Sequence, residues 1–560
     1  MMRTLSLAFW RLFRIIQIMI VTPILIGGTF VFLLLGAAAG AVVATPLVFA
    51  FFDQVPGEES LANWLVLIPC MGIGAVVGVA MWLQMSGAET FFGTLIGSSH
   101  GSARFAGKRD LKALEQAKGL LIGRNPRTGK LLSYDGPAHL LTLAPTRAGK
   151  GVGTVIPNLL VAERSVLVID PKGENARIAG TAREQFGTVH VLDPFDVSDT
   201  GKVSGRPSAA YNPLDRLDAN NPDLSEDAAS LADALVFDPA QQTGDAHWNE
   251  EAKALIAGLI MFCVAHEEPE RRNLGSVREY LTLPPDRLNA LLELMQDSDA
   301  ADGLIARAAN RFVGKADREA ASVLSNAQRH THFLDSPRIA RCMARSDFAF
   351  SDLRHQVTSV FLVLPPNRLD AYSRWLRLLV SQALQDIARD AERPQPASEG
   401  PSEQLKAPTL FLLDEFAALG RLEAVERAMG LMAGYGLQLW PILQDMSQLR
   451  DLYGQRAATF VANAGVQQVF GVNDYDTAKW LSQTLGQETI GYQTESRKPG
   501  DMPTTGIQVT GRDLLTPDEI MQLPPDLQLL RVQGQATAVA QKLRYYADPE
   551  FVGLFTPEAS

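Results

Sequence analysis

The chain has 560 residues, of which 46% are hydrophobic and 20% charged, and its formal net charge is −11. This apolar content excludes a chain that is disordered throughout, and three widely spaced cysteines exclude a disulfide-built scaffold. The acidic balance excludes a protein that coats nucleic acid by bulk positive charge. A mean hydropathy near zero at this charge content indicates an uneven distribution of apolar residues.

The apolar residues are concentrated near the amino terminus, where residues 15–52 and 61–85 contain no charged residue. A spanning helix needs about 20 apolar residues, so residues 1–90 are predicted to form a two-helix transmembrane hairpin with spans near 22–46 and 61–85. Arginines before the first span and basic residues after the second predict that both termini are cytoplasmic. A cleaved signal peptide and two buried core helices are the alternatives. Small residues inside the spans favour close helix approach and self-association.

Beyond Met85, short apolar runs such as 139–144, 165–170 and 408–415 alternate with helical patterns. This alternation is typical of a parallel sheet buried on both faces, and it predicts an α/β fold. The stretch 215–345 lacks strand-like runs and has helical spacing, so we expect an all-α insertion there. The nucleotide-binding α/β domain would then be built from two parts, 91–214 and 346–560.

A candidate phosphate-binding loop follows the first of these runs and precedes an apolar helix. A strand–turn–helix setting lets backbone N–H groups and a helix N-terminus converge on phosphates, while a lysine supplies charge. Ala144 replaces the usual first glycine and Gly151 replaces the Ser or Thr that would bind Mg²⁺; Thr146, Thr154 or water are the alternatives for that ligand. The predicted ATP-binding residues are Ala144, Pro145, Thr146, Arg147, Ala148, Gly149, Lys150, Gly151 and Val152.

Polar residues at the ends of two later strands complete the predicted site. Asp414 and Glu415 end the run 408–415. We expect Asp414 to hold Mg²⁺ and Glu415 to act as general base toward the attacking water; a solvated turn is the alternative. Gln444 ends the strand-like run 437–443 and is expected to orient that water. Because ligands bind at the carboxyl ends of parallel strands, Lys150, Glu415 and Gln444 form the predicted catalytic row.

Asp170, Lys172 and Glu174 follow the run 165–170 directly. They either support the phosphate-binding loop or form an ordinary strand-to-helix turn.

In these motifs the chain resembles the coupling ATPases of conjugation and type IV secretion, the TraG-type family. The resemblance extends from residue 100 to about 545, and the segments that carry it are HGSARFA, APTRAGKGVGTVIPNLL, VLVIDPKGEN, HWNEEAKALI, FLVLPPNRL, LFLLDEFAALG, the Gln444 strand and GRDLLTPDEIMQLPPDLQLL. It implies a RecA-like P-loop motor domain with an inserted all-α domain, using ATP and Mg²⁺. It also implies a homo-hexamer at the bacterial inner membrane, with the bulk of the chain cytoplasmic, that hands substrates to a type IV secretion channel. These substrates are relaxase-bound single-stranded DNA, effector proteins or both.

The resemblance further implies that an arginine of the neighbouring subunit completes each site, with the candidates Arg421, Arg450, Arg456 and Arg512. A basic set in the insertion could line a narrow passage for DNA, although a solvated helix surface with ion pairs is favoured; its members are Arg307, Arg311, Lys315, Arg318, Arg329, Arg338, Arg341 and Arg345. No aromatic ladder for base stacking is evident. A chromosome-partition-type DNA translocase and a non-hydrolysing membrane scaffold are the alternative functions.

Overall fold

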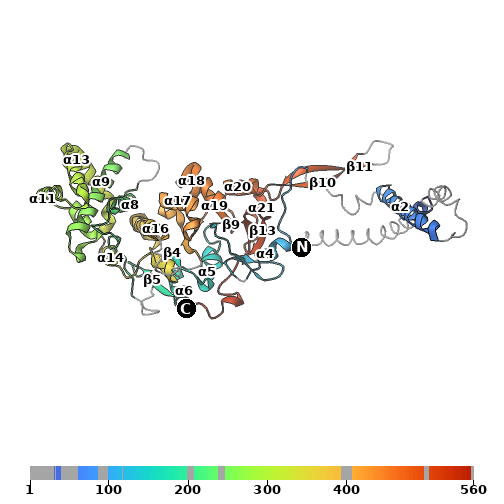
Figure 1. The fold of residues 1–560 in the computed structure, drawn as a ribbon, viewed down its shortest axis with the longest axis horizontal. Coiled ribbons are helices and arrows are strands. Elements are labelled where there is room, and N and C mark those ends of the chain that lie inside the picture. The colour runs from blue at the N-terminus through green and yellow to red at the C-terminus, as the bar shows by residue number, and fades with distance from the viewer. Residues whose placement is uncertain are drawn as a thin grey trace. The chain divides into compact units, whose positions relative to one another are not determined.

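A computed structural model of the chain describes residues 31, 33–39, 61–85, 99–116, 118–198, 207–237, 246–392, 407–496 and 504–556. The chain divides into two compact units, which Figure 1 shows as ribbons. One unit comprises residues 1–102 with 488–512, and the other comprises residues 103–487 with 513–560. Each unit is described by itself below.

The larger unit is built on an 11-stranded sheet with the order β2-β1-β13-β12-β9-β3-β8-β7-β4-β6-β5. The strands from β9 to β5 run parallel, whereas β12, β13, β1 and β2 extend the sheet in antiparallel fashion. The strand bounds are β1 (Leu120–Arg124), β2 (Leu131–Tyr134), β3 (His139–Leu143), β4 (Val166–Asp170), β5 (Thr188–Leu192), β6 (Thr358–Val363), β7 (Thr409–Leu413), β8 (Leu437–Leu443), β9 (Ala464–Val469), β12 (Leu527–Val532) and β13 (Ala538–Gln541).

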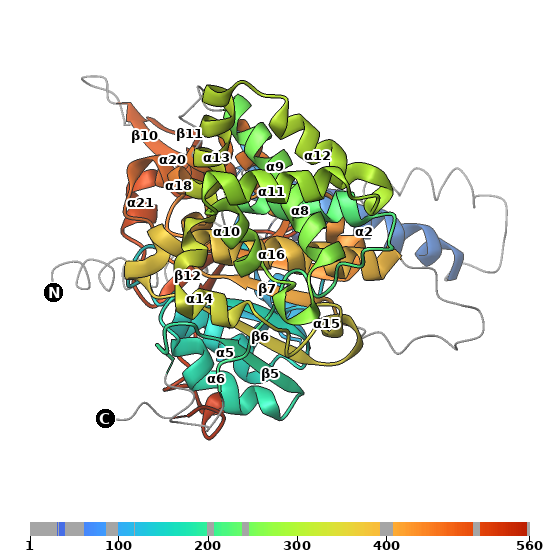
Figure 2. The same cartoon turned by 90° about the vertical axis from the view of Figure 1, so that its left-hand side faces the viewer.

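Helices cover both faces of this sheet, so successive strand residues enter different cores. Val168 packs in one hydrophobic cluster with residues of α5 (Ile156–Val161) and α6 (Glu174–Glu184). Its neighbours Leu167 and Ile169 pack in the other cluster with residues of α16 (Leu369–Glu392). Figure 2 shows α5 and α6 on one side of the strands and α16 on the other. This arrangement confirms the predicted α/β, RecA-like architecture.

Between β5 and β6, the described residues form helices and contain no strand. Figure 1 shows α9, α11 and α13 gathered together. Whether residues 215–345 form a separate domain remains a prediction. The helices are α8 (Leu224–Leu235), α9 (Ala246–His266), α10 (Leu274–Leu281), α11 (Pro285–Gln296), α12 (Leu304–Val313), α13 (Asp317–Thr331), α14 (Pro337–Cys342) and α15 (Asp352–His355).

The larger unit contains further α-helices outside the segment between β5 and β6. They are α4 (Lys108–Leu114), α17 (Glu423–Leu431), α18 (Met446–Tyr453), α19 (Ala457–Asn463), α20 (Tyr475–Leu485) and α21 (Pro517–Met521).

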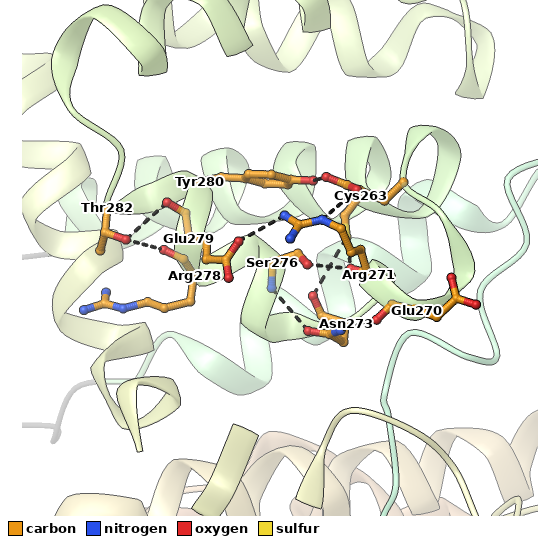
Figure 3. Close-up of polar contacts among 10 residues, drawn as sticks. Cys263, Glu270, Arg271, Asn273, Ser276, Arg278, Glu279, Tyr280 and Thr282 are labelled. Carbon is orange, nitrogen blue, oxygen red and sulfur yellow. Dashed lines mark hydrogen bonds and ion pairs between the residues drawn. The ribbon is translucent and has the colours of Figure 1, made fainter. Parts of the chain in front are cut away.

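The corner between α9 and α10 is fixed by polar contacts, which Figure 3 shows. The Asn273 side chain caps α10 by accepting a hydrogen bond from the Ser276 backbone N–H. Arg271 bridges to Glu279 at 3.0 Å. Burial raises the pKa of the Cys263 thiol to about 11, and this thiol donates to the Arg271 carbonyl. Cys263 therefore acts as a packed core group in its neutral form.

The smaller unit contains α2 (Leu61–Met85), helical residues 33–39, and a two-stranded ribbon of β10 (Gln487–Ser496) and β11 (Thr504–Asp513). A Cβ on Gly36 would overlap the Gly74 carbonyl oxygen and lie 3.1 Å from the Gly78 Cα. The glycines thus allow the two helices to approach closely, as the sequence predicted.

The predicted bounds of the second span coincide with α2, whereas most of the first span, 22–46, lies outside the described residues. Within the part of the chain that the structure describes, no helix has both the length and the apolarity needed to cross a membrane.

Candidate active site

The turn after β3 has a tight backbone. Arg147 and Gly149 adopt positive φ angles of 65° and 91°, a region that non-glycine residues such as Arg147 seldom occupy. The Ala148 N–H closes the turn by donating to the Pro145 carbonyl at 3.0 Å. A Cβ built on Gly149 or Gly151 would meet no atom within 4 Å. The loop therefore offers open space next to its backbone, as a phosphate-binding loop requires.

Lys150 begins the following helical segment and lies against the two acidic residues after β7. Its Nζ is 2.8 Å from Asp414 Oδ1 and also donates to Glu415 Oε1. Burial acts to lower the pKa of Lys150, but attraction and hydrogen bonding from the two carboxylates outweigh it and raise this pKa. Burial raises the pKa of Asp414, against the opposing charge of Lys150. Glu415 holds a φ of 53°, a strained conformation that is common at functional sites.

Gln444 joins this group because β8 lies between β3 and β7 in the sheet. Its Nε2 donates to Glu415 Oε2 at 3.3 Å, and its Oε1 accepts from Thr146 Oγ1 at 3.3 Å. The structure thus brings together Lys150, Asp414, Glu415, Gln444 and Thr146 at the carboxyl ends of three parallel strands. The predicted residues Pro145, Arg147 and Val152 have no such polar side-chain contact in the described chain.

The two threonines that the sequence left open as Mg²⁺ ligands lie in different places. Thr154 is fully buried beneath the loop, and its hydroxyl donates to Gln468 Oε1 at 3.1 Å. Thr146 is exposed and contacts Gln444. Only Thr146 therefore shares the site with the carboxylates.

The site fits a magnesium ion whose ligands come partly from the protein and partly from the phosphates of a nucleotide. The described residues contain no group of three or more His, Cys, Asp or Glu side chains that could hold a metal. Mg²⁺ is commonly bound through one or two carboxylates together with substrate phosphates and water. Asp414 and Glu415, facing an open loop and a lysine, provide this kind of site.

Asp170 lies at the end of β4 and forms the strand-to-helix turn, one of the two interpretations left open by the sequence. Its carboxylate accepts the Ala176 backbone N–H at 2.8 Å in the first turns of α6. Burial raises the pKa of Asp170 to about 7. Lys172 is exposed and Glu174 is half-buried.

The basic set of the insertion is partly neutralised. Arg311 and Lys315 both pair with Glu251 of α9, at 2.7 and 2.8 Å, and lower the pKa of Glu251 to about 2. Arg345 pairs with Asp347 at 3.1 Å. Arg311 and Arg345 are 53% and 63% exposed, as the favoured interpretation expects, whereas Lys315 and Glu251 are only 11% and 10% exposed.

The four arginines predicted as candidates to complete a neighbouring subunit's site differ in their surroundings. Arg421 and Arg456 both contact Glu426, at 3.6 and 2.7 Å. Arg512 lies 3.6 Å from Glu488. Arg450 is exposed on α18, the helix that follows Gln444.

One residue next to the loop was missed by sequence reasoning. Lys542 follows β13, and its Nζ donates to the Ala148 carbonyl at 3.1 Å. Nearly 400 residues separate Lys542 from Ala148, and a lone lysine after a short strand carries no motif. The pairing of β13 with both β1 and β12 in the sheet brings it to the loop.

The chain matches the family model described as Type IV secretory system Conjugative DNA transfer over residues 104–558. A conjugal transfer protein TraG of Escherichia coli is 31% identical over 466 residues, which is 76% of this chain and 71% of that protein. VirD4 of Agrobacterium fabrum is 28% identical over 533 residues, covering 92% and 75%.

Solved structures of a bacterial conjugative coupling protein, TrwB, are also similar. The unbound TrwBdeltaN70 form has a TM-score of 0.59 at 18% identity, covering 81% of this chain and 98% of that one. TrwB in complex with ADP and Mg²⁺ has a TM-score of 0.58 at 18% identity, covering 80% and 96%. At this identity the similarity shows the fold alone.

Proposed function

Because this chain belongs to the type IV secretory system conjugative DNA transfer family, we propose that it is a coupling ATPase of a type IV secretion system. It recruits DNA–protein or effector-protein substrates and delivers them to the secretion channel, using ATP binding and hydrolysis. The observation that carries this proposal is the contact of Lys150 with the adjacent carboxylates Asp414 and Glu415 beneath an open loop.

The geometry suggests a role for each residue. The backbone of residues 144–152 cradles the phosphates of ATP, and Lys150 exchanges its carboxylate partners for the β- and γ-phosphates. Asp414 would hold Mg²⁺, and the bound ion would neutralise charge on the phosphates. Glu415 then accepts a proton from the attacking water. Gln444, already in contact with Glu415, orients that water.

We further propose that the motor is attached to the bacterial inner membrane by a hairpin within residues 1–90. Two uncharged runs in the sequence and the close approach of Gly36 to Gly74 support this attachment. The motor is proposed to act as a homo-hexamer in which an arginine from one subunit completes the neighbour's site. Arg450 is the first candidate to test, because Arg421 and Arg456 already contact Glu426.

The test uses full-length protein purified in detergent, with ATP binding and hydrolysis measured separately. Lys150→Ala should lose both. Glu415→Gln should retain binding and lose turnover by roughly 10²–10⁴-fold, the usual contribution of a general base. Glu293→Gln, whose parent side chain is exposed on α11 in the helical segment between β5 and β6, is the matched control and should behave as wild type. If Lys150→Ala and Glu415→Gln both hydrolyse ATP normally, the site assignment is wrong.

The same variants test transport in cells. Glu415→Gln should abolish plasmid transfer between cells, or secretion of effector proteins, if hydrolysis drives delivery. A non-hydrolysing scaffold would instead support transport at the wild-type level with this substitution.

A further inference from the structure

Lys542 occupies an unusual position for a cation. It immediately follows β13, and its backbone N–H donates to the Asp526 carbonyl at 2.8 Å, which fixes the start of its side chain. Its Nζ donates to two backbone carbonyls, that of Phe470 at 2.7 Å and that of Ala148 at 3.1 Å. The ammonium also lies 4.8 Å from the centre of the Phe470 ring. Two carbonyls and a ring face therefore surround it.

This ammonium has no ion pair with any described carboxylate. Burial lowers the pKa of Lys542 to about 8, opposed by the charge of Asp526. A lysine that merely filled space at the surface would extend its charge into water. Keeping the charge half-buried between carbonyls indicates that its hydrogen bonds are the reason for its position.

The carbonyl that Lys542 holds belongs to the most constrained part of the loop. Ala148 stands between Arg147 and Gly149, the two residues with positive φ. In a planar trans peptide, the C=O and the following N–H point in opposite directions. Holding the Ala148 carbonyl toward Lys542 therefore turns the Gly149 N–H away from Lys542.

The segment around Lys542 also supports the helical segment Gly151–Val155 that follows the loop. The Tyr545 N–H donates to the Val152 carbonyl at 3.4 Å. A Cβ on Gly153 would lie 3.0 Å from the Leu543 carbonyl oxygen and 3.2 Å from the Phe470 ring. The carboxyl-terminal segment and the residue after β9 are thus packed directly under the loop, whereas Gly149 and Gly151 face open space.

We propose that Lys542 is a positioning residue of the ATP site, which fixes the Ala148–Gly149 peptide so that the Gly149 N–H is presented to a nucleotide phosphate. This role rests on the proposed function, because it requires a nucleotide at the loop. Lys542 itself does not touch the reacting atoms. Its removal should weaken nucleotide binding more than it slows the chemical step.

The experiment compares full-length wild-type protein with Lys542→Met, Lys542→Arg and Lys479→Met. Methionine keeps the length of the side chain without donors, and arginine restores donors for both carbonyls. Lys479 is exposed on α20, so Lys479→Met is the matched control. The readouts are the Kd for Mg·ADP, the KM and kcat for ATP, and hydrogen exchange of residues 144–152 without nucleotide.

We expect Lys542→Met to raise Kd and KM by about tenfold and to change kcat by less than about threefold. The tenfold rise corresponds to the loss of one net hydrogen bond made by a charged group. Exchange should accelerate at the loop in this variant, Lys542→Arg should recover most of the affinity, and Lys479→Met should match wild type. Wild-type affinity in Lys542→Met overturns the proposal. The proposal is also overturned if Lys542→Met and Lys542→Arg lose affinity equally while hydrogen exchange of the loop is unchanged. That result would indicate that Lys542 acts only through side-chain packing.

Lys150→Ala, measured in parallel, separates this proposal from the proposed function. If Lys150→Ala binds nucleotide as wild type does, the ATP site itself is wrong. If Lys150→Ala loses binding while Lys542→Met keeps it, only the role of Lys542 is wrong. Should Lys542→Met fail to fold, Lys542→Gln retains one donor group and carries the same comparison, with a smaller rise in Kd expected.

Discussion

Replacing Lys150 by methionine should destabilise the nucleotide-free protein, because the lysine is the counterion of a buried carboxylate. Its Nζ lies 2.8 Å from Asp414 Oδ1, and the two side chains are only 17% and 13% exposed. At an effective dielectric constant of about 20, the attraction over this distance is about 6 kcal/mol as an upper bound. Removing one partner of a buried pair commonly costs about 3–5 kcal/mol. Because Glu415 shares the lysine, we expect a coupling energy of about 3 kcal/mol between Lys150 and Asp414.

The assay is a double-mutant cycle of Lys150→Met and Asp414→Asn, read as urea-unfolding midpoints without nucleotide. The double variant should be less destabilised than the sum of the two single variants. The matched control is the same cycle on Arg345 and Asp347, an exposed pair at 3.1 Å, which should couple by less than about 1 kcal/mol. Additivity of Lys150→Met and Asp414→Asn within about 0.5 kcal/mol would refute the argument that the lysine neutralises this carboxylate.

Three further predictions concern buried groups around the site. Burial raises the pKa of Asp170 from its ordinary value of 3.8 to about 7, so the folded state binds more protons and stability falls as pH rises through that window. Asp170→Asn should remove up to about 4 kcal/mol of this pH dependence, measured as urea midpoints at pH 4 and pH 8 beside wild type. Gly153→Ala should destabilise the protein by about 1–2 kcal/mol because its Cβ would lie 3.0 Å from the Leu543 carbonyl oxygen. The control Gly430→Ala, with open space around it on α17, should stabilise by about 0.5–1 kcal/mol. Equal shifts of the melting temperature in the two variants would contradict this reasoning. Arg377→Met should lower stability by about 2–4 kcal/mol and reduce ATP turnover. The buried Arg377 guanidinium donates to the Leu419 and Arg421 carbonyls, at 2.6 and 2.8 Å, in the loop that follows Asp414 and Glu415. Unchanged turnover would show that this loop does not position the site.

Much of the candidate site could be predicted because its chemistry sits at strand ends. Lys150 and Asp414 are 264 residues apart, yet both follow apolar strands, and parallel strands place their carboxyl ends at one edge. The same reasoning placed Gln444 beside Glu415. The resemblance to the coupling ATPase family, carried by these motifs, is confirmed by the family match over residues 104–558.

Other features depended on which surfaces the fold buries. Thr146 and Thr154 are both hydroxyl residues near Lys150, and spacing alone did not separate them. Packing beneath the loop places the Thr154 hydroxyl against Gln468, a residue of β9. Likewise, a string of basic residues shows no partner in sequence, but Glu251 of α9 meets Arg311 and Lys315 once the helices pack.

The sequence by itself determined the α/β architecture, the glycine-containing turn after β3 and the acidic end of β7, because each depends on local periodicity and on residues close together in the chain. Only the tertiary structure decided which side chains meet that loop from outside the parallel strands. The antiparallel extension brings β13 into the sheet and carries Lys542 to the Ala148 carbonyl. Strand pairing over several hundred residues is a property of the folded sheet, and no local pattern encodes it.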